Sequence, residues 1–180
     1  GETWQEQGDA PDWQRLYERR EPMERGVVPS WATVVTAGVD NQSAGEGRLE
    51  YAIWAWGAGL RSALIDAGAV LGDPARAEAW DELHAALSAE LPRESGGTMT
   101  IAKIGVDTGG SVTSAVYGHL RRLRDPRILP LKGEDGWNRT AMVAGPTLVD
   151  ATEGGKKIKR GLKLWRASVS MLKAELYRRL

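Results

Sequence analysis

The sequence predicts an α/β fold with a central mixed sheet, and three observations lead to that class. Residues 33–42 form an apolar, β-branched run that contains Asp40, which is typical of a buried strand. Residues 99–110 form a second such run, which again reads Gly-Val-Asp and reaches Asp107. Segments with the spacing of amphipathic helices follow these runs. Because open α/β proteins place their sites at the carboxyl ends of central strands, Asp40 and Asp107 are the first candidate site residues.

The composition limits the chemistry that is available. The 180 residues are 42% hydrophobic and 27% charged, which suits one well-buried domain. The chain has no cysteine, which excludes disulfides, thiolate metal sites and a cysteine nucleophile, and it has only His84 and His119. A bound metal would therefore need carboxylate oxygens, which favours Mg²⁺ or Mn²⁺. No apolar run is long enough to span a bilayer and the acidic start is no signal peptide, so we expect a soluble, intracellular protein without membrane partners.

A formal net charge of zero conceals a basic C-terminal segment. Residues 151–180 carry nine lysines and arginines against two glutamates. Such a segment suits contact with phosphates, and the alternative is a solvated charged face.

The elements before residue 72 are predicted to be a short helix and three strands. The helix covers residues 12–20, with Asp12 as its N-cap. The strands cover residues 33–40, 48–56 and 60–70. The links between them are short and contain glycine, so we expect an antiparallel meander.

Helices and strands alternate in the rest of the chain. Asp73 and Pro74 predict the start of a helix that ends at Pro92, and residues 99–107 predict the fourth strand. Ser111 is the predicted N-cap of the next helix. We then expect a strand at 128–131, an irregular glycine-rich segment at 132–155, a strand at 162–167 and a helix at 169–180.

This order, β-β-β-α-β-α-β, is that of the ribonuclease H-like fold. In that fold the first and fourth strands are neighbours, which would bring Asp40 and Asp107 together. Two adjacent carboxylates need a shared proton or a divalent cation, and we favour the cation. Such a pair can hold one or two Mg²⁺ ions, about 3.5–4 Å apart, that activate water for attack on a phosphodiester.

Four motifs, GVVPSWATVVTAGVDNQ, WAWGAGLRSALID, IAKIGVDTGG and GKKIKRGLKLW, resemble the nuclease domain of the large terminase subunit of tailed bacteriophages, lambda type (the gpA family). The resemblance implies a divalent-metal-dependent endonuclease that cuts concatemeric double-stranded DNA in the cytoplasm of the bacterial host. It also implies three partners besides DNA: the small terminase subunit, the procapsid portal and the ATPase domain of the same polypeptide. Asp40 matches the metal ligand on the family's first strand, and Asp107 matches the acid on its fourth strand.

The resemblance also divides the chain. Residues 1–30 look like the linker that follows the ATPase domain, and residues 31–180 like the nuclease domain. Nucleases of this fold usually draw a third acid from a later helix. Asp150 and Glu175 are the candidates within the chain, and the third ligand can also lie beyond Leu180.

The basic residues near the C-terminus follow the pattern of a β-ribbon. Lysines and an arginine are interrupted by Ile158, Leu162 and Leu164, as on a β-ribbon with one buried face; the cations are Lys156, Lys157, Lys159, Arg160 and Lys163. A ribbon beside the active site would grip DNA phosphates without sequence specificity. The alternative is a strand edge that lysines protect from pairing.

Two other functions remain open at this point. The chain is then either a catalytically silent module that binds DNA and docks within the packaging motor, or an ATPase domain of the sugar-kinase or actin type that uses Asp107 to Gly110 around a phosphate. Divalent-dependent nicking of DNA distinguishes the endonuclease, and stabilisation by nucleotide distinguishes the ATPase.

Overall fold

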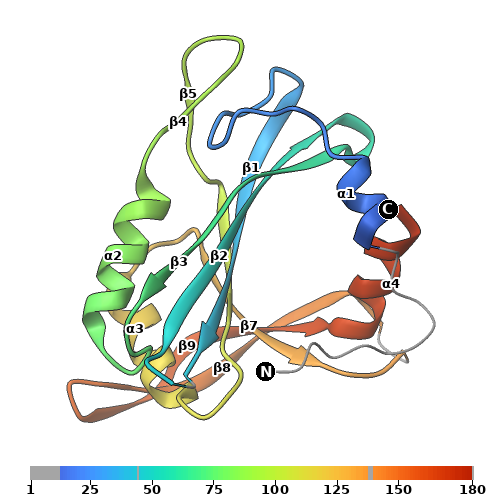
Figure 1. Ribbon diagram of the computed structural model, residues 1–180. Coiled ribbons are helices and arrows are strands. Elements are labelled where there is room, and N and C mark those ends of the chain that lie inside the picture. The colour runs from blue at the N-terminus through green and yellow to red at the C-terminus, as the bar shows by residue number, and fades with distance from the viewer. Residues whose placement is uncertain (1–12, 44, 138–139, 180) are drawn as a thin grey trace.

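The computed structural model describes residues 13–43, 45–137 and 140–179. The described part contains a seven-stranded sheet, a two-stranded sheet and four α-helices (Figure 1). The helices are α1 (Trp13–Glu18), α2 (Ala77–Ser88), α3 (Thr113–Leu123) and α4 (Val169–Arg179), and a 3₁₀ turn, η1, covers Ala58–Leu60. The strands are β1 (Ala32–Gln42), β2 (Arg48–Gly57), β3 (Ser62–Leu71), β4 (Leu91–Pro92), β5 (Thr98–Met99), β6 (Lys103–Asp107), β7 (Ile128–Glu134), β8 (Val143–Glu153) and β9 (Lys156–Ser168).

The large sheet has the order β3-β2-β1-β6-β7-β9-β8. Strands β1, β2 and β3 form the predicted antiparallel meander, and β6 pairs in parallel with β1. Strands β7 and β9 continue in parallel, and β8 closes the edge as the antiparallel partner of β9. The sheet order and the helices α2, α3 and α4 around it confirm the predicted ribonuclease H-like α/β fold.

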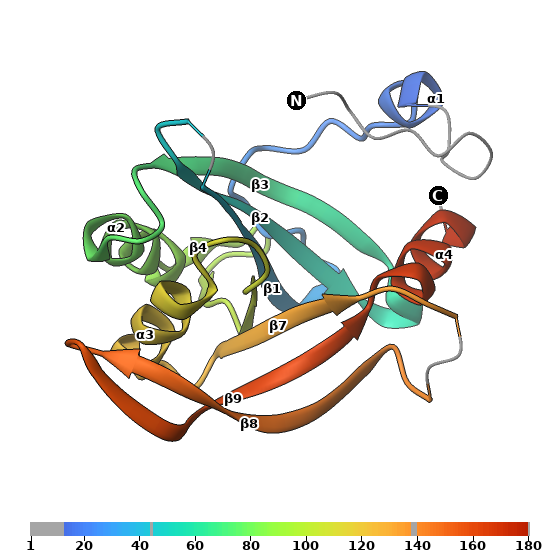
Figure 2. The same cartoon turned by 90° about the horizontal axis from the view of Figure 1, so that it is seen from below.

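Helices α2 and α3 cover one face of the sheet, which we call the helix face (Figure 2). Side chains from β1 and β6 alternate between the two faces. Val39, Ile104 and Val106 point to the helix face, where they join Trp80 of α2 and Leu120 of α3 in the core. The residues between them along each strand point to the opposite face, which we call the open face.

Helix α4 approaches the sheet from the open face. A Cβ on Gly133 of β7 would lie 3.0 Å from the Val169 side chain at the start of α4. Further along α4, Leu172 and Leu176 face Trp54 and Trp56 of β2 across a groove. Helix α4 is therefore placed against the far end of the meander from Asp40 (Figure 1).

Helix α2 is shorter than predicted at both ends. It begins at Ala77, with Arg76 in the N-cap position, rather than at Asp73 and Pro74. The Asp73 carboxylate instead accepts a hydrogen bond from the Ala75 N–H (2.8 Å) and closes a turn before the helix. The helix ends at Ser88, because the following residues turn back as the small hairpin of β4 and β5.

The predicted fourth strand, residues 99–107, is two strands. Thr98–Met99 is β5 and belongs to the small hairpin, whereas Lys103–Asp107 is β6 and belongs to the large sheet. The predicted N-cap Ser111 is also wrong, because Val112 occupies that position. The Ser111 hydroxyl lies 3.0 Å from the Ser43 hydroxyl instead.

The segment 132–155 is not irregular. Strand β7 continues to Glu134, and β8 covers Val143–Glu153. Strand β8 gives no alternating pattern because it is an edge strand, in which Ala151 is the one buried residue. Strand β9 is likewise longer than the predicted 162–167. The predicted N-cap Asp12 lies outside the described residues.

No helix in the described ranges combines the length and the apolar character needed to cross a membrane.

Candidate active site

Asp40 and Asp107 lie side by side. The last paired residues of the parallel β1–β6 ladder are Val39 and Val106, and each acid is the next residue along its strand. Both valines are buried on the helix face, so both aspartates point to the open face. Neighbouring strands lie about 4.8 Å apart, so the two carboxylates project from adjacent positions on this face.

Each carboxylate has one oxygen engaged by a neutral donor. Gln42, two residues along the same strand face, donates its Nε2–H to Oδ2 of Asp40. The backbone N–H of Gly109 donates to Oδ1 of Asp107 (3.0 Å). Within the described ranges, no lysine, arginine or histidine forms an ion pair with either acid. Two adjacent anions without a counter-ion fit a divalent cation, which prefers carboxylate oxygens.

Next to the two acids, the open face is uncovered on β1 but covered on β6, where the Leu131 side chain lies 2.9 Å from the position of a Cβ on Gly105. Gly38 precedes Asp40 by two residues on this face, and Gly105 holds the equivalent place before Asp107. A Cβ on Gly38 would meet no atom of the structure within 4 Å. A large ligand can therefore approach the backbone of β1 beside the acids.

The backbone at Asp107 is held from both sides. From the β7 side, the Thr108 N–H and hydroxyl both donate to the Leu131 carbonyl, each at 2.8 Å. From the β1 side, Asn41 Nδ2–H donates to the Asp107 carbonyl at 2.8 Å and lies 3.5 Å from the Gly109 carbonyl. The turn that carries Asp107 is thus part of the rigid sheet edge.

A third carboxylate shares the open face. Glu50 of β2 is the register partner of Asp40, so their side chains stand next to each other on the same face. The Glu50 carboxylate turns toward Arg48 Nε, 2.6 Å away. Glu50 could not be predicted from the sequence, because only the register of the β1–β2 hairpin places it next to Asp40. Among the described residues, no three acidic or histidine side chains are grouped closely enough to hold a metal ion.

The two predicted third acids are not brought to this pair. Asp150 lies on β8, where it accepts a hydrogen bond from the Arg160 N–H (2.9 Å) and pairs with Lys157 (3.0 Å); these contacts lower the pKa of Asp150 below its ordinary value. Glu175 lies on α4, pairs with Arg178 (2.6 Å) and lines the groove beside Trp54. Trp54 pairs with Thr36, which is about 13 Å along β1 from Asp40.

The predicted basic residues do lie on a β-ribbon, the β8–β9 hairpin, but they divide into two groups. Leu131 is the register partner of both Asp107 and Trp165, so Trp165 lies in the same row across the open face. Lys163 precedes Trp165 by two residues and is exposed on that face, about 10 Å across the sheet from the Asp107 strand. Of the five cations, Lys163 is therefore the nearest to the row of Asp107 along β9.

The other four cations lie toward the hairpin tip, which we call the basic arm; its members are Lys156, Lys157, Lys159 and Arg160. The arm extends past the start of β7 and lies against α3 (Figures 1 and 2). Arg121 of α3 fixes it by pairing with Glu153 (3.0 Å) and donating to the Gly161 carbonyl (2.7 Å). The prediction of a whole ribbon beside the acids is thus corrected: the arm is at the opposite end of β9.

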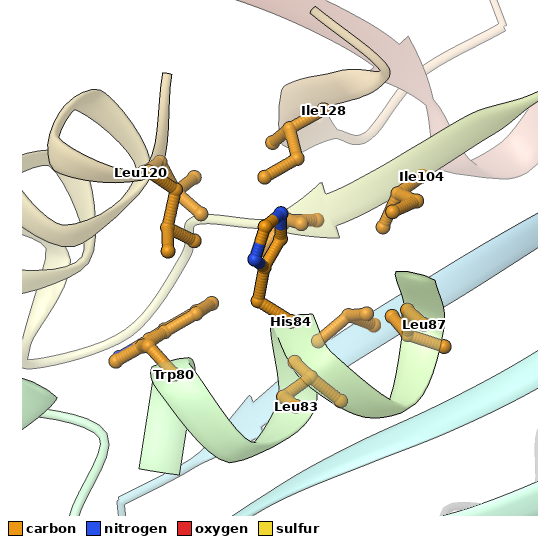
Figure 3. Close-up of a pocket in the computed structure, with 10 residues that line it drawn as sticks. Trp80, Leu83, His84, Leu87, Ile104, Leu120 and Ile128 are labelled. Carbon is orange, nitrogen blue, oxygen red and sulfur yellow. The ribbon is translucent and has the colours of Figure 1, made fainter. Parts of the chain in front are cut away.

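The small cavity between α2, α3 and the sheet belongs to the core. Figure 3 shows His84 among apolar side chains that include Trp80, Ile104 and Leu120. The cavity measures about 10 Å³, roughly the space of one water molecule. His84 Nε2 lies 2.9 Å from the Asp125 carboxylate, so this histidine links α2 to the turn before β7 and is not available as a ligand.

A ribonuclease H-like sheet with paired carboxylates at the ends of two neighbouring parallel strands is an arrangement typical of metal-dependent nucleases. Residues 1–180 match the family model described as "Terminase large subunit gpA, endonuclease domain", and the chain belongs to this phage DNA-packaging nuclease family. It is 31% identical, over 180 residues, to the large terminase subunit of Escherichia phage lambda. The match covers 99% of this chain and 26% of that relative, so the chain spans about a quarter of the relative's length. No solved structure matches the chain.

Proposed function

We propose that this domain is a divalent-metal-dependent endonuclease that cuts concatemeric double-stranded viral DNA by hydrolysing phosphodiester bonds. Asp40 and Asp107 are the proposed metal ligands, with Asp40 shared between two Mg²⁺ or Mn²⁺ ions and Asp107 holding one of them. The observation that carries the proposal is the placement of these two acids at adjacent positions on the open face, where no described lysine, arginine or histidine forms an ion pair with either. The family match supplies the substrate class.

The residues present fit this chemistry. When bound, the ions lower the pKa of a coordinated water and stabilise the developing charge on the leaving oxygen. Gln42 and the Gly109 N–H each hold one oxygen of an acid, which leaves the other oxygen free for a ligand. Gly38 keeps the surface next to Asp40 clear for the DNA backbone. Lys163 provides a positive charge for a phosphate further along the same face.

The third carboxylate of the site is a separate part of the proposal. Among the described acids, Glu50 has the shortest path, because a rotation away from Arg48 brings its carboxylate to the side of Asp40. Asp150 would first have to leave Lys157 and the Arg160 N–H. Glu175 would have to cross the open face from the groove beside Trp54.

The proposed partners follow from the family. They are double-stranded DNA, the small terminase subunit, the portal of the procapsid and the ATPase domain of the same polypeptide, in the cytoplasm of the bacterial host. The basic arm offers four positive charges, of which Lys157 is offset by Asp150, for a sequence-independent contact with DNA phosphates.

The competing proposal is a module that binds DNA and docks within the motor without cutting. Incubation of supercoiled plasmid with the chain in Mg²⁺, in Mn²⁺ and in EDTA separates the two. An endonuclease converts the plasmid to nicked and linear forms with either ion and leaves it intact in EDTA. Retardation of the plasmid on a gel without any cleavage under all three conditions would instead favour the docking module.

A further inference from the structure

The β1–β6 ladder stops one residue before the two acids. Its last register pair is Val39 with Val106, whereas β1 continues to pair with β2 as far as Gln42. After Val106 the chain leaves β1 and turns toward β7, where Thr108 binds the Leu131 carbonyl. The next backbone hydrogen bond of this ladder, at the level of the two acids, is therefore missing.

The side chain of Asn41 takes the place of that missing bond. Asn41 follows Asp40 on β1, and its Nδ2–H donates to the Asp107 carbonyl at 2.8 Å, where the next rung of a ladder would lie. The same amide lies 3.5 Å from the Gly109 carbonyl, so it spans the turn whose Gly109 N–H holds the Asp107 carboxylate. One side chain thus ties the neighbour of the first acid to the backbone of the second.

A second contact nearby offers an internal comparison. Ser43 and Ser111 bring the same two loops together through a hydroxyl pair at 3.0 Å. That pair is exposed, and in the sequence both serines lie further than Asn41 from the acid that precedes them. In the described structure, neither serine forms a hydrogen bond with the backbone of Asp40, Asp107 or Gly109. It joins the loops without setting the orientation of either carboxylate.

We propose that Asn41 is a positioning residue that sets the distance between the carboxylates of Asp40 and Asp107, and so controls the affinity of their site for a divalent cation. This inference rests on the proposed function, because it assumes that the two acids bind metal. Partners that orient metal ligands typically change metal affinity or activity about 10- to 100-fold when they are lost. We expect Asn41→Ala to fall in that range.

The test is Mn²⁺ binding by isothermal titration calorimetry, at a temperature well below the melting temperature of every variant. Asn41→Ala is expected to bind Mn²⁺ at least about tenfold more weakly than the wild type. Ser43→Ala, which removes a hydrogen bond between the same loops, is expected to bind like the wild type. Val116→Ala, in the buried core of α3, serves as a destabilised control that keeps its affinity. Asn41→Ser replaces Asn41→Ala if the latter does not fold, with the same expectation.

The outcomes separate this inference from the proposed function. Equal Mn²⁺ affinity in the wild type and the Asn41 variant would overturn the role of Asn41 and leave the nuclease proposal standing. A wild type that binds no Mn²⁺ would overturn both. Weakening by Val116→Ala to the same degree as Asn41→Ala would show that loss of stability alone lowers the affinity, and would also overturn the role of Asn41.

Discussion

Asp40 and Asp107 occupy equivalent positions, one residue beyond the last pair of the β1–β6 ladder, and both point away from α2 and α3. The two acids lie far apart in the sequence, so only the parallel pairing of β1 and β6 makes them neighbours. The fold therefore holds two like charges together at a site where neutral donors bind each of them.

The repulsion between the acids predicts opposite effects of one substitution with and without metal. Without metal, Asp40→Asn is expected to raise the melting temperature slightly, because it removes one of two adjacent negative charges. With Mn²⁺, the wild type is expected to gain stability and Asp40→Asn to gain little, since a ligand stabilises only the state that binds it. Thermal unfolding with Mn²⁺ and with EDTA measures both effects. A wild type that Mn²⁺ leaves unchanged would contradict this prediction.

Lys163 and Lys157 are expected to differ in their contribution to DNA binding. Lys163 is exposed on the open face, whereas Lys157 is paired with Asp150 at 3.0 Å. Lys163→Ala should weaken binding to any duplex and lower the slope of log affinity against log salt by about 0.9. Lys157→Ala should have a smaller effect. Fluorescence anisotropy in EDTA, at salt concentrations from about 50 to about 200 mM, measures the affinity of each variant for DNA. Equal slopes for the two variants would contradict the prediction.

The Asp125 carboxylate should stabilise the fold in a pH-dependent way. Its side chain is 8% exposed and lies 2.6 Å from Arg127 Nη2 and 2.9 Å from His84 Nε2. The Arg127 guanidinium holds the pKa of Asp125 far below its ordinary value. A lowered folded-state pKa favours the charged form, so the stabilisation is fully present above the unfolded-state pKa, about 4, and is lost progressively as the pH falls from there toward the folded-state pKa.

Asp125→Asn should therefore lower the free energy of unfolding by about 3 kcal/mol at neutral pH, because it leaves Arg127 without its partner. The difference from the wild type should shrink below about pH 4.5, where the wild-type carboxylate also loses its advantage. Urea unfolding at several pH values measures the difference. A constant difference from pH 7 to pH 3 would argue against the ion pair as its cause.

Gly118 is expected to tolerate no side chain. A Cβ at this position of α3 would lie 2.2 Å from the Thr152 carbonyl oxygen of β8. Gly118→Ala should therefore destabilise the domain, although alanine normally stabilises a helix by about 1 kcal/mol relative to glycine. Gly38→Ala is the matched control, since its Cβ would meet no atom within 4 Å. Melting temperatures of both variants test this, and a more stable Gly118→Ala would contradict the packing of β8 on α3.

The sequence allowed the central part of the fold to be predicted because those strands bury one or both faces. The runs through Val39 and Val106 are apolar for that reason, and the two acids stand out at their ends. The edge strand β8 was missed because only Ala151 of its residues is buried. Residues 99–107 do not form the single strand that was predicted. Apolar residues such as Met99, Ile101 and Ile104 continue from β5 into β6, although these strands belong to different sheets.

The contacts that complete the site depend on residues far apart in the sequence. Asn41 binds a carbonyl 66 residues away, and no local pattern marks it. Glu50 stands beside Asp40 only because of the hairpin register. The basic residues were correctly expected on a β-ribbon, but the curl of that ribbon over α3, fixed by Arg121 and Glu153, separates most of them from the acids.

The most direct test of the account is plasmid cleavage in Mn²⁺ by the wild type, Asp40→Asn, Asp107→Asn and Asp81→Asn. Asp81 lies on α2, away from the open face, and pairs with Arg122. Asp81→Asn is therefore the control, because it makes the same chemical change outside the proposed site. Asp40→Asn and Asp107→Asn are each expected to cut more than about a hundredfold more slowly than the wild type, because the loss of a residue that only orients a metal ligand already lowers activity about 10- to 100-fold. Asp81→Asn is expected to cut like the wild type. Wild-type cleavage rates in Asp40→Asn and Asp107→Asn would contradict the account.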